Sequence, residues 1–127
     1  MIYKLPKGSR KRLSKNFRAW EFDCHCGRCR ETLIDEKLVE GLQKIRDKFN
    51  LPVTIVSGYR CKSHNKRVGG VSKSQHLLGR AADIVVYSVS PFVVANQCGH
   101  FKGLGRYRTF THCDVRTGNK ARWRNYN

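Results

Sequence analysis

The chain has 127 residues, of which 39% are hydrophobic, and its 26 Lys and Arg residues against 9 Asp and Glu residues give a formal net charge of +17. This length and composition predict one domain that buries roughly two-thirds of its unfolded surface, which excludes global disorder. No apolar run approaches the roughly 18 residues of a membrane span. The charge indicates either a polyanionic neighbour or a reason to tolerate self-repulsion, and nucleic acid and the anionic polymers of a bacterial cell wall are the candidate neighbours.

The first part of the chain is basic. Residues 1–16 predict a basic N-terminal arm, and residues 17–127 the folded domain. Phe17, Trp20 and Phe22 are the aromatic residues that we expect to anchor the arm. The basic residues are spread along the chain without a base-reading motif, so we expect no specific nucleic-acid partner.

The segment from Asp35 to Phe49 predicts a helix. Asp35 is suited to the N-cap, and Pro52 follows the predicted end. The apolar positions recur at spacings of four, three and four residues, as on one face of a helix. They are Leu38, Leu42, Ile45 and Phe49.

The remaining elements are short. In chain order we expect a strand at 53–56, a helical turn at 62–68, a strand at 82–87, a helix at 92–97 and a hairpin of strands 104–107 and 110–115. Few strands and helices in mixed order predict an α+β domain, with a small antiparallel sheet and flanking helices.

Three residues are candidate metal ligands. His76 and Asp83 lie seven positions apart across a predicted loop, and His112 lies in the last predicted strand. Strand alternation places Phe110, His112 and Asp114 on one face. Two imidazoles and one carboxylate form a ligand set that leaves zinc an open fourth position, as catalytic zinc requires.

The residues around the first two candidates form a longer pattern. Ser-x-His-x-x-Gly-x-Ala-x-Asp is matched at every fixed position from Ser74 to Asp83. With its surroundings this pattern resembles the zinc D-alanyl-D-alanine carboxypeptidases and their endolysin relatives, peptidoglycan peptidases that share a fold with the hedgehog signalling domain. The resemblance extends from Phe17 to Trp123. Its other parts are Ser57-Gly58-Tyr59-Arg60, Asn65-x-x-Val68-Gly69-Gly70, Gly105-Arg106-Tyr107, the stretch from Thr111 to Arg116, and a cysteine-rich opening from Glu21 to Gly27 that is similar to small phage-encoded members.

The resemblance implies a zinc-dependent hydrolase of peptidoglycan peptide bonds, either a DD-carboxypeptidase or an endopeptidase. It implies that His76, Asp83 and His112 hold Zn²⁺ and that Arg60 binds a carboxylate of the peptidoglycan stem peptide. A planar guanidinium matches a carboxylate with two parallel hydrogen bonds. Ser74 is expected to contact the substrate or to orient His76.

The general base is missing from its usual places. Better-known branches of the family that the sequence resembles have a Glu three residues before the last ligand, where this chain has Thr109. Others have a His two residues before that ligand, where this chain has Phe110. Asp114 is the nearest carboxylate, and we consider it as the base or as a residue that orients His112. His64 is a second candidate, for stabilising the oxyanion.

Six cysteines are present, and four of them suggest a shared site. Cys24, Cys26 and Cys29 lie close in sequence, and Cys61 follows Arg60. A second metal, a disulfide or free thiols remain open for these four. The other two, Cys98 and Cys113, are expected to be buried as small hydrophobic residues.

Two alternatives to the peptidase remain. The missing base favours a cell-wall-binding module that keeps the zinc site without catalysis, and net charge alone favours a nucleic-acid-binding protein. The basic N-terminus lacks the apolar stretch of a signal peptide. We therefore expect synthesis in the cytoplasm of an infected bacterium and action on the wall after release, or as part of a virion, for phage lysis or host penetration.

Overall fold

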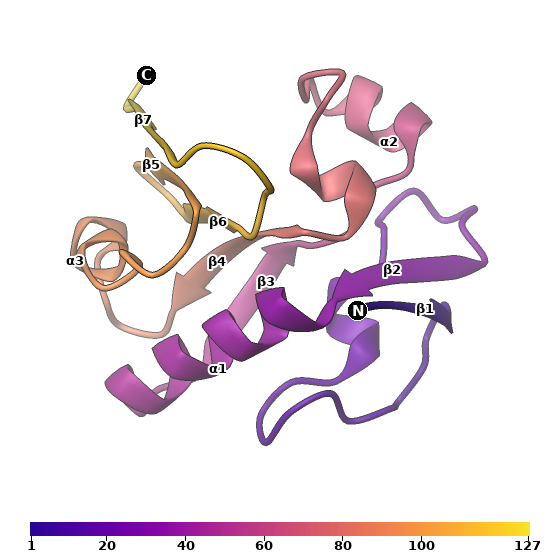
Figure 1. Cartoon of the computed structure of the whole chain (residues 1–127), viewed down its shortest axis with the longest axis horizontal. Coiled ribbons are helices and arrows are strands. Elements are labelled where there is room, and N and C mark those ends of the chain that lie inside the picture. The colour runs from indigo at the N-terminus through magenta and orange to yellow at the C-terminus, as the bar shows by residue number, and fades with distance from the viewer.

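The computed structural model describes all 127 residues and contains two β-sheets, three α-helices and two short 3₁₀ helices (Figure 1). The predicted α+β class is confirmed, and each element expected from the sequence is present within a few residues of its predicted ends. The elements are β1 (Ile2–Pro6), η1 (Ala19–Phe22), β2 (Glu31–Asp35), α1 (Glu36–Phe49), β3 (Val53–Ser57), α2 (Lys62–Arg67), η2 (Gln75–Leu78), β4 (Ala81–Val86), α3 (Pro91–Asn96), β5 (Gly103–Tyr107), β6 (Thr111–Asp114) and β7 (Ala121–Asn125).

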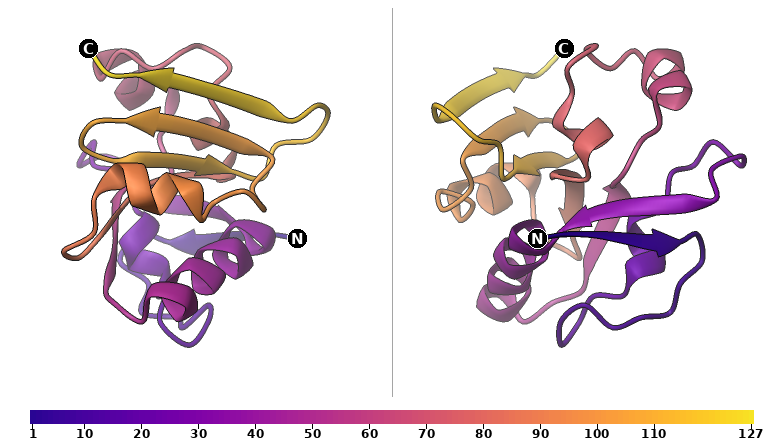
Figure 2. Two further views of the ribbon diagram at one scale, coloured as in Figure 1. Left: turned by 90° about the vertical axis from the view of Figure 1, so that its left-hand side faces the viewer. Right: turned by 45° about the vertical axis from the view of Figure 1, so that its right-hand side comes forward.

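The larger sheet has five strands in the order β3-β4-β6-β5-β7. All neighbours in it are antiparallel except β5 and β7, which are parallel. Figure 2 shows β7 at one edge of this sheet, with α1 and the pair β1–β2 toward the opposite end of the molecule. The sheet is therefore mixed rather than purely antiparallel, because β7, which the sequence did not predict, adds a parallel edge.

Helix α1 begins and ends at residues suited to those places. The side chain of Asp35 accepts a hydrogen bond from the backbone N–H of Lys37 at 2.9 Å, which confirms the predicted N-cap. Asn50 ends the helix with a left-handed φ of 51°. The buried face includes Leu38, Leu42 and Ile45.

One face of the five-stranded sheet forms the hydrophobic core. Ala82, Ile84 and Val86 of β4 and Cys113 of β6 belong to the same buried cluster as apolar residues of α1 and α3. Successive side chains of a strand alternate between faces, so Asp83 lies on the opposite face of the sheet. The core thus places polar residues of two central strands on a face that the helices leave free.

The N-terminal segment contributes a small sheet of its own. Strand β1 pairs with β2 in antiparallel register along its full length, and neither strand was expected from the sequence. Phe17 and Phe22 are buried, as expected of anchors, but Trp20 remains 52% exposed, so the expectation that it docks was wrong. The boundary after residue 16 stays a prediction.

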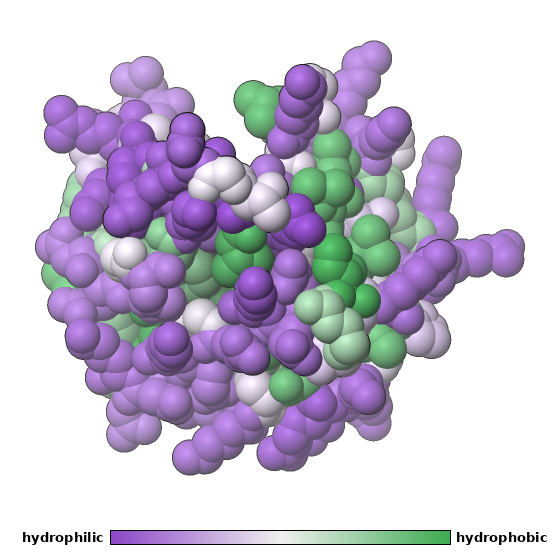
Figure 3. Space-filling view, viewed as in Figure 1, coloured by the Kyte–Doolittle hydropathy of each residue, from purple (hydrophilic) through white to green (hydrophobic).

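Apolar surface is limited. Figure 3 shows a mainly hydrophilic face with apolar side chains to the right of its centre. Cys98 and Cys113 are fully buried in the core, which confirms their expected role. The longest helix, α1, has 14 residues, and no helix has the length and apolar character needed to cross a membrane.

Candidate functional site

The sheet register brings Asp83 and His112 together. The two residues are direct partners across the antiparallel strands β4 and β6. Direct partners on one face have Cβ atoms roughly 5 Å apart, within reach of polar side chains. Nδ1 of His112 lies 3.0 Å from Oδ1 of Asp83.

His76 reaches the same carboxylate from a short 3₁₀ helix. Ser74 is the N-cap of η2, and its hydroxyl accepts the backbone N–H of His76 at 3.2 Å. Gly79 ends η2 with a left-handed φ of 72° and leads directly into β4. As a result Nε2 of His76 lies 3.3 Å from Oδ1 of Asp83.

In each imidazole, the nitrogen that faces away from Asp83 makes a hydrogen bond to an acceptor elsewhere in the protein. Nδ1 of His76 lies 2.7 Å from the carbonyl oxygen of Gly58, and Nε2 of His112 lies 2.7 Å from Oδ2 of Asp114. A carbonyl oxygen and an ionised carboxylate accept only, so these nitrogens carry the protons. The other nitrogen of each imidazole, Nε2 of His76 and Nδ1 of His112, faces Asp83 and can bind a metal ion when it carries no proton.

This arrangement fits a divalent metal ion. One ligand atom from each of His76, Asp83 and His112 lies within 4.8 Å of the others, and all three residues are buried. Neutral imidazole nitrogens and a carboxylate oxygen suit zinc, and the second hydrogen bond on each imidazole resembles the outer contacts of metal-binding histidines.

The protonation of the site follows from these contacts. Burial alone would raise the pKa of Asp83, but hydrogen bonds from His112 and His76 hold that pKa below its ordinary value. Burial would lower the pKa of His112, yet the hydrogen bonds to Asp114 and Asp83 outweigh it and raise that pKa. Asp83 is therefore ionised at neutral pH, as a metal ligand must be.

Asp114 contacts His112 but does not line the cavity. Its carboxylate is fully buried and accepts Nε and Nη2 of Arg116 at 2.8 and 2.7 Å, in addition to His112. Burial acts to raise the pKa of Asp114, but the bonds from Arg116 and His112 hold it below its ordinary value. A Cβ on Gly103 would lie 2.2 Å from this carboxylate, so the adjacent strand needs glycine there.

Arg60 is held by three protein partners. Its Nη2 donates to Oδ2 of Asp83 at 3.1 Å, its Nε to Ser57 at 3.0 Å, and its Nη1 to Oδ1 of Asn65 at 3.3 Å. The side chain is 14% exposed and still reaches the cavity. Arg60 therefore supports the carboxylate of Asp83, a contact that the sequence did not predict.

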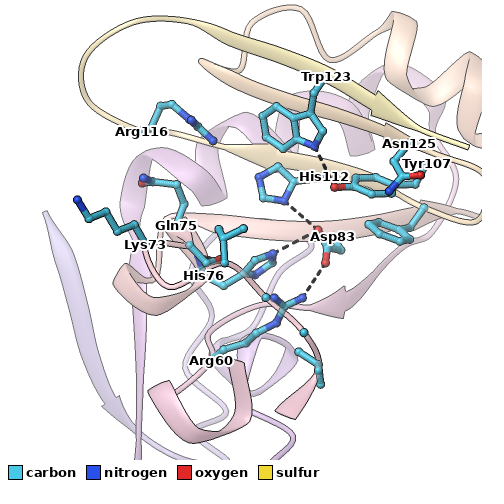
Figure 4. A pocket seen from close by; sticks show the side chains of 16 residues that line it. Arg60, Lys73, Gln75, His76, Asp83, Tyr107, His112, Arg116, Trp123 and Asn125 are labelled. Atoms are coloured by element: carbon cyan, nitrogen blue, oxygen red, sulfur yellow. Dashed lines mark hydrogen bonds and ion pairs between the residues drawn. The ribbon is translucent and has the colours of Figure 1, made fainter. Parts of the chain in front are cut away.

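A cavity of about 580 Å³ opens over the three candidate ligands. Figure 4 shows His76, His112 and Arg60 directed at Asp83, with Trp123 above His112 and Tyr107 to its right. Asp83 is the single acidic residue in the lining. The other residues that give the lining its character are the cations Lys73 and Arg116, the polar Ser74, Gln75 and Asn125, and the aromatic Tyr107, Phe110 and Trp123.

His64 lies elsewhere. It belongs to α2 and is not among the residues that line the cavity, and its imidazole lies 6.3 Å from that of His25 between ring centroids. The structure therefore does not bring His64 to the three candidate ligands, unlike Arg60 and Ser74. Helix α2 carries its side chain toward the cysteine-rich segment instead.

The four cysteines singled out from the sequence are gathered at one place. Sγ atoms of Cys24, Cys26, Cys29 and Cys61 lie within 4.8 Å of one another. The backbone N–H of Arg28 donates to Cys26 and lowers the pKa of that thiol to about 6. Burial raises the pKa of Cys29.

Two parts of the site were not assigned from the sequence. Asn65 accepts from Arg60 and donates to the carbonyl of Val71 at 2.8 Å, so it joins two loops. The indole N–H of Trp123 donates to the hydroxyl of Tyr107 at 2.9 Å, and the indole ring lies 5.0 Å from His112 between centroids. The signal available for Trp123 was Gly105, a glycine inside a predicted strand. A glycine in a strand often marks a place where another group approaches the backbone closely.

Comparison with known proteins agrees with this site. No curated protein matches the sequence. The sequence model of the family described as Peptidase M15 matches residues 15–114, which include all three candidate ligands and most of the chain. The chain therefore belongs to the Peptidase M15 family.

Proposed function

We propose that the protein is a zinc peptidase that hydrolyses peptide bonds of bacterial peptidoglycan, as a DD-carboxypeptidase or an endopeptidase. The observation that carries the proposal is the convergence of His76, Asp83 and His112 on one point at the base of an open cavity. Membership of the Peptidase M15 family supports the same reaction. When bound, zinc supplies Lewis-acid chemistry, because it polarises a carbonyl oxygen and makes water more acidic.

The chain's own residues then position the metal ligands. Gly58 and Asp114 orient the two imidazoles, and Arg60 holds the outer oxygen of Asp83. We assign Asp114 a positioning role rather than that of the base, because it is fully buried and contacts the nitrogen of His112 that faces away from Asp83.

The cavity lining suits an anionic peptide. Lys73 and Arg116 are cations on the lining, and peptidoglycan stem peptides carry free carboxylates. The aromatic side of the lining, with Tyr107 and Trp123, offers apolar surface to short side chains such as that of alanine. Over the whole molecule the net charge of +17 would hold the enzyme on anionic wall polymers.

The biological setting is also part of the proposal. The cysteine-rich opening from Glu21 to Gly27 is similar to that of small phage-encoded members. We place the protein in phage lysis or host penetration, made in the cytoplasm of an infected bacterium and acting on the wall after release or within a virion.

One observation favours a second function, a zinc-containing wall-binding module without catalysis. Thr109 and Phe110 stand where a base is expected, and Asp83 is the single carboxylate on the cavity lining. A binding module requires the metal ligands and the cationic lining but no base.

The two functions are separated by treating purified peptidoglycan with the zinc-loaded protein and identifying soluble products by mass spectrometry. The peptidase predicts products that a chelator and His76→Ala abolish, and the products name the bond. A matched control is His100→Ala, since His100 is exposed and outside the cavity. Wall binding without products, from folded and zinc-loaded protein, would establish the binding module instead.

A further inference from the structure

Four thiols from two distant segments meet outside the cavity. Cys24, Cys26 and Cys29 lie on the loop between η1 and β2, and Cys61 immediately precedes α2. The Sγ atoms of Cys24 and Cys61 are 3.9 Å apart and those of Cys26 and Cys29 are 3.2 Å apart. None of the four lines the cavity that contains His76, Asp83 and His112.

The spacing of the sulfur atoms suits a tetrahedral metal site. In a tetrahedron with metal–sulfur bonds of about 2.3 Å, the sulfurs lie about 3.8 Å apart. All four Sγ atoms here lie within 4.8 Å of one another. A disulfide would join two sulfurs at about 2.05 Å and would not require the second pair to gather around the first.

The backbone around the cysteines is arranged to stabilise thiolates. The N–H groups of Arg28 and Cys29 both donate to Sγ of Cys26 at 3.3 Å, and the N–H of Cys61 points at Sγ of Cys24 at 3.5 Å. Gly27 adopts a left-handed φ of 76°, which allows the tight turn that aims two N–H groups at one sulfur. Hydrogen bonds to ligating sulfurs are typical of metal–thiolate sites.

Nearby charge also favours such a site. Four thiolates around a divalent ion carry a net charge of −2, which is costly unless cations are close. Arg28, Arg30 and Lys62 adjoin the cysteines in sequence, and the whole chain is strongly basic. Attraction between opposite charges at a partly exposed site lowers the cost of gathering the thiolates.

We propose that Cys24, Cys26, Cys29 and Cys61 bind a second, structural zinc ion. A closed set of four thiolates leaves no open position, so this metal stabilises the fold and takes no part in hydrolysis. Its location gives it a specific consequence. Because Cys61 follows Arg60, the metal ties the cysteine-rich loop to the residue that supports Asp83.

The experiment is metal analysis and cobalt substitution of the whole protein purified under reducing conditions. We expect two zinc ions per chain, one for each ligand group. Cobalt should produce the intense near-ultraviolet charge-transfer absorption of thiolate ligands. That absorption should persist in His76→Ala, which separates this proposal from the proposed function, and disappear in Cys26→Ser/Cys29→Ser.

Cys98→Ala is the control, since it removes a thiol from the core without touching the four cysteines. Should the double variant fail to fold, the wild-type cobalt spectrum still decides. Cobalt bound without thiolate absorption, a single zinc ion per chain that His76→Ala removes, or a Cys24–Cys61 or Cys26–Cys29 disulfide found by mass spectrometry would each overturn the proposal.

Discussion

Nε2 of His112 lies 2.7 Å from Oδ2 of Asp114, and this contact decides which nitrogen of the imidazole faces Asp83. With Nε2 bonded to Asp114, Nδ1 is the nitrogen that faces Asp83, 3.0 Å away, and that can bind a metal ion when it carries no proton. The carbonyl oxygen of Gly58 orients His76 in the same way, but through Nδ1, so that Nε2 faces Asp83. The two histidines are thus oriented by groups outside the cavity before any metal binds.

Asp114→Asn should weaken zinc binding at the His76, Asp83 and His112 site by about 10- to 100-fold, as loss of an outer partner of a metal-binding histidine does. The amide keeps the shape but loses the charge that orients His112. Competition with a chromogenic chelator measures the affinity. Asp47→Asn, on the exposed face of α1, should change nothing. Unchanged zinc affinity with a lower kcat would instead identify Asp114 as the base.

The same residue should make the metal-free protein sensitive to acid. The pKa of Asp114 is held below its reference value of 3.8, so its stabilising contribution is complete above about pH 4 and is lost as the pH falls through the lower folded value. Near pH 6 the free energy of unfolding of the wild type should be about 2 kcal/mol higher than that of Asp114→Asn, because the variant loses hydrogen bonds between charged groups. Urea unfolding in chelator should show this difference shrinking by about pH 3; a constant difference would contradict it.

Gly103→Ala should destabilise the protein by about 1–3 kcal/mol, because its Cβ would lie 2.2 Å from the buried carboxylate of Asp114. Displacement of Asp114 should also weaken zinc binding through His112. Gly99→Ala is a matched control, since no atom lies within 4 Å of its added Cβ. Thermal unfolding with and without zinc measures both effects. Equal stability of the two variants would show that the strand moves aside.

Arg60→Lys should lower zinc affinity, because lysine keeps the charge but cannot contact Asp83, Ser57 and Asn65 together. The loss should be several-fold, smaller than for removal of a ligand. Arg46→Lys on α1 is the control. If Arg60 instead served mainly to bind substrate, the variant would raise KM and leave zinc affinity unchanged.

Much of the fold follows from local pattern. The spacing of Leu38, Leu42 and Ile45 predicts α1, and Asp35 caps it as expected. Strands β1 and β2 escaped prediction because a pair at the edge of the domain is defined by backbone pairing between segments far apart in sequence. Strand β7 escaped for the same reason, since its partner β5 comes from a separate part of the chain.

The sequence by itself identified His76, Asp83 and His112 as candidate metal ligands, because their residue types and the pattern from Ser74 to Asp83 are typical of such a site. Only the tertiary structure decided their partners. The register between β4 and β6 sets His112 beside Asp83, and the contacts of the buried Asp114 with His112 and Arg116 hold its carboxylate away from the cavity. The same holds for Cys61 beside Cys24, since a contact across 37 residues depends on packing rather than on local spacing.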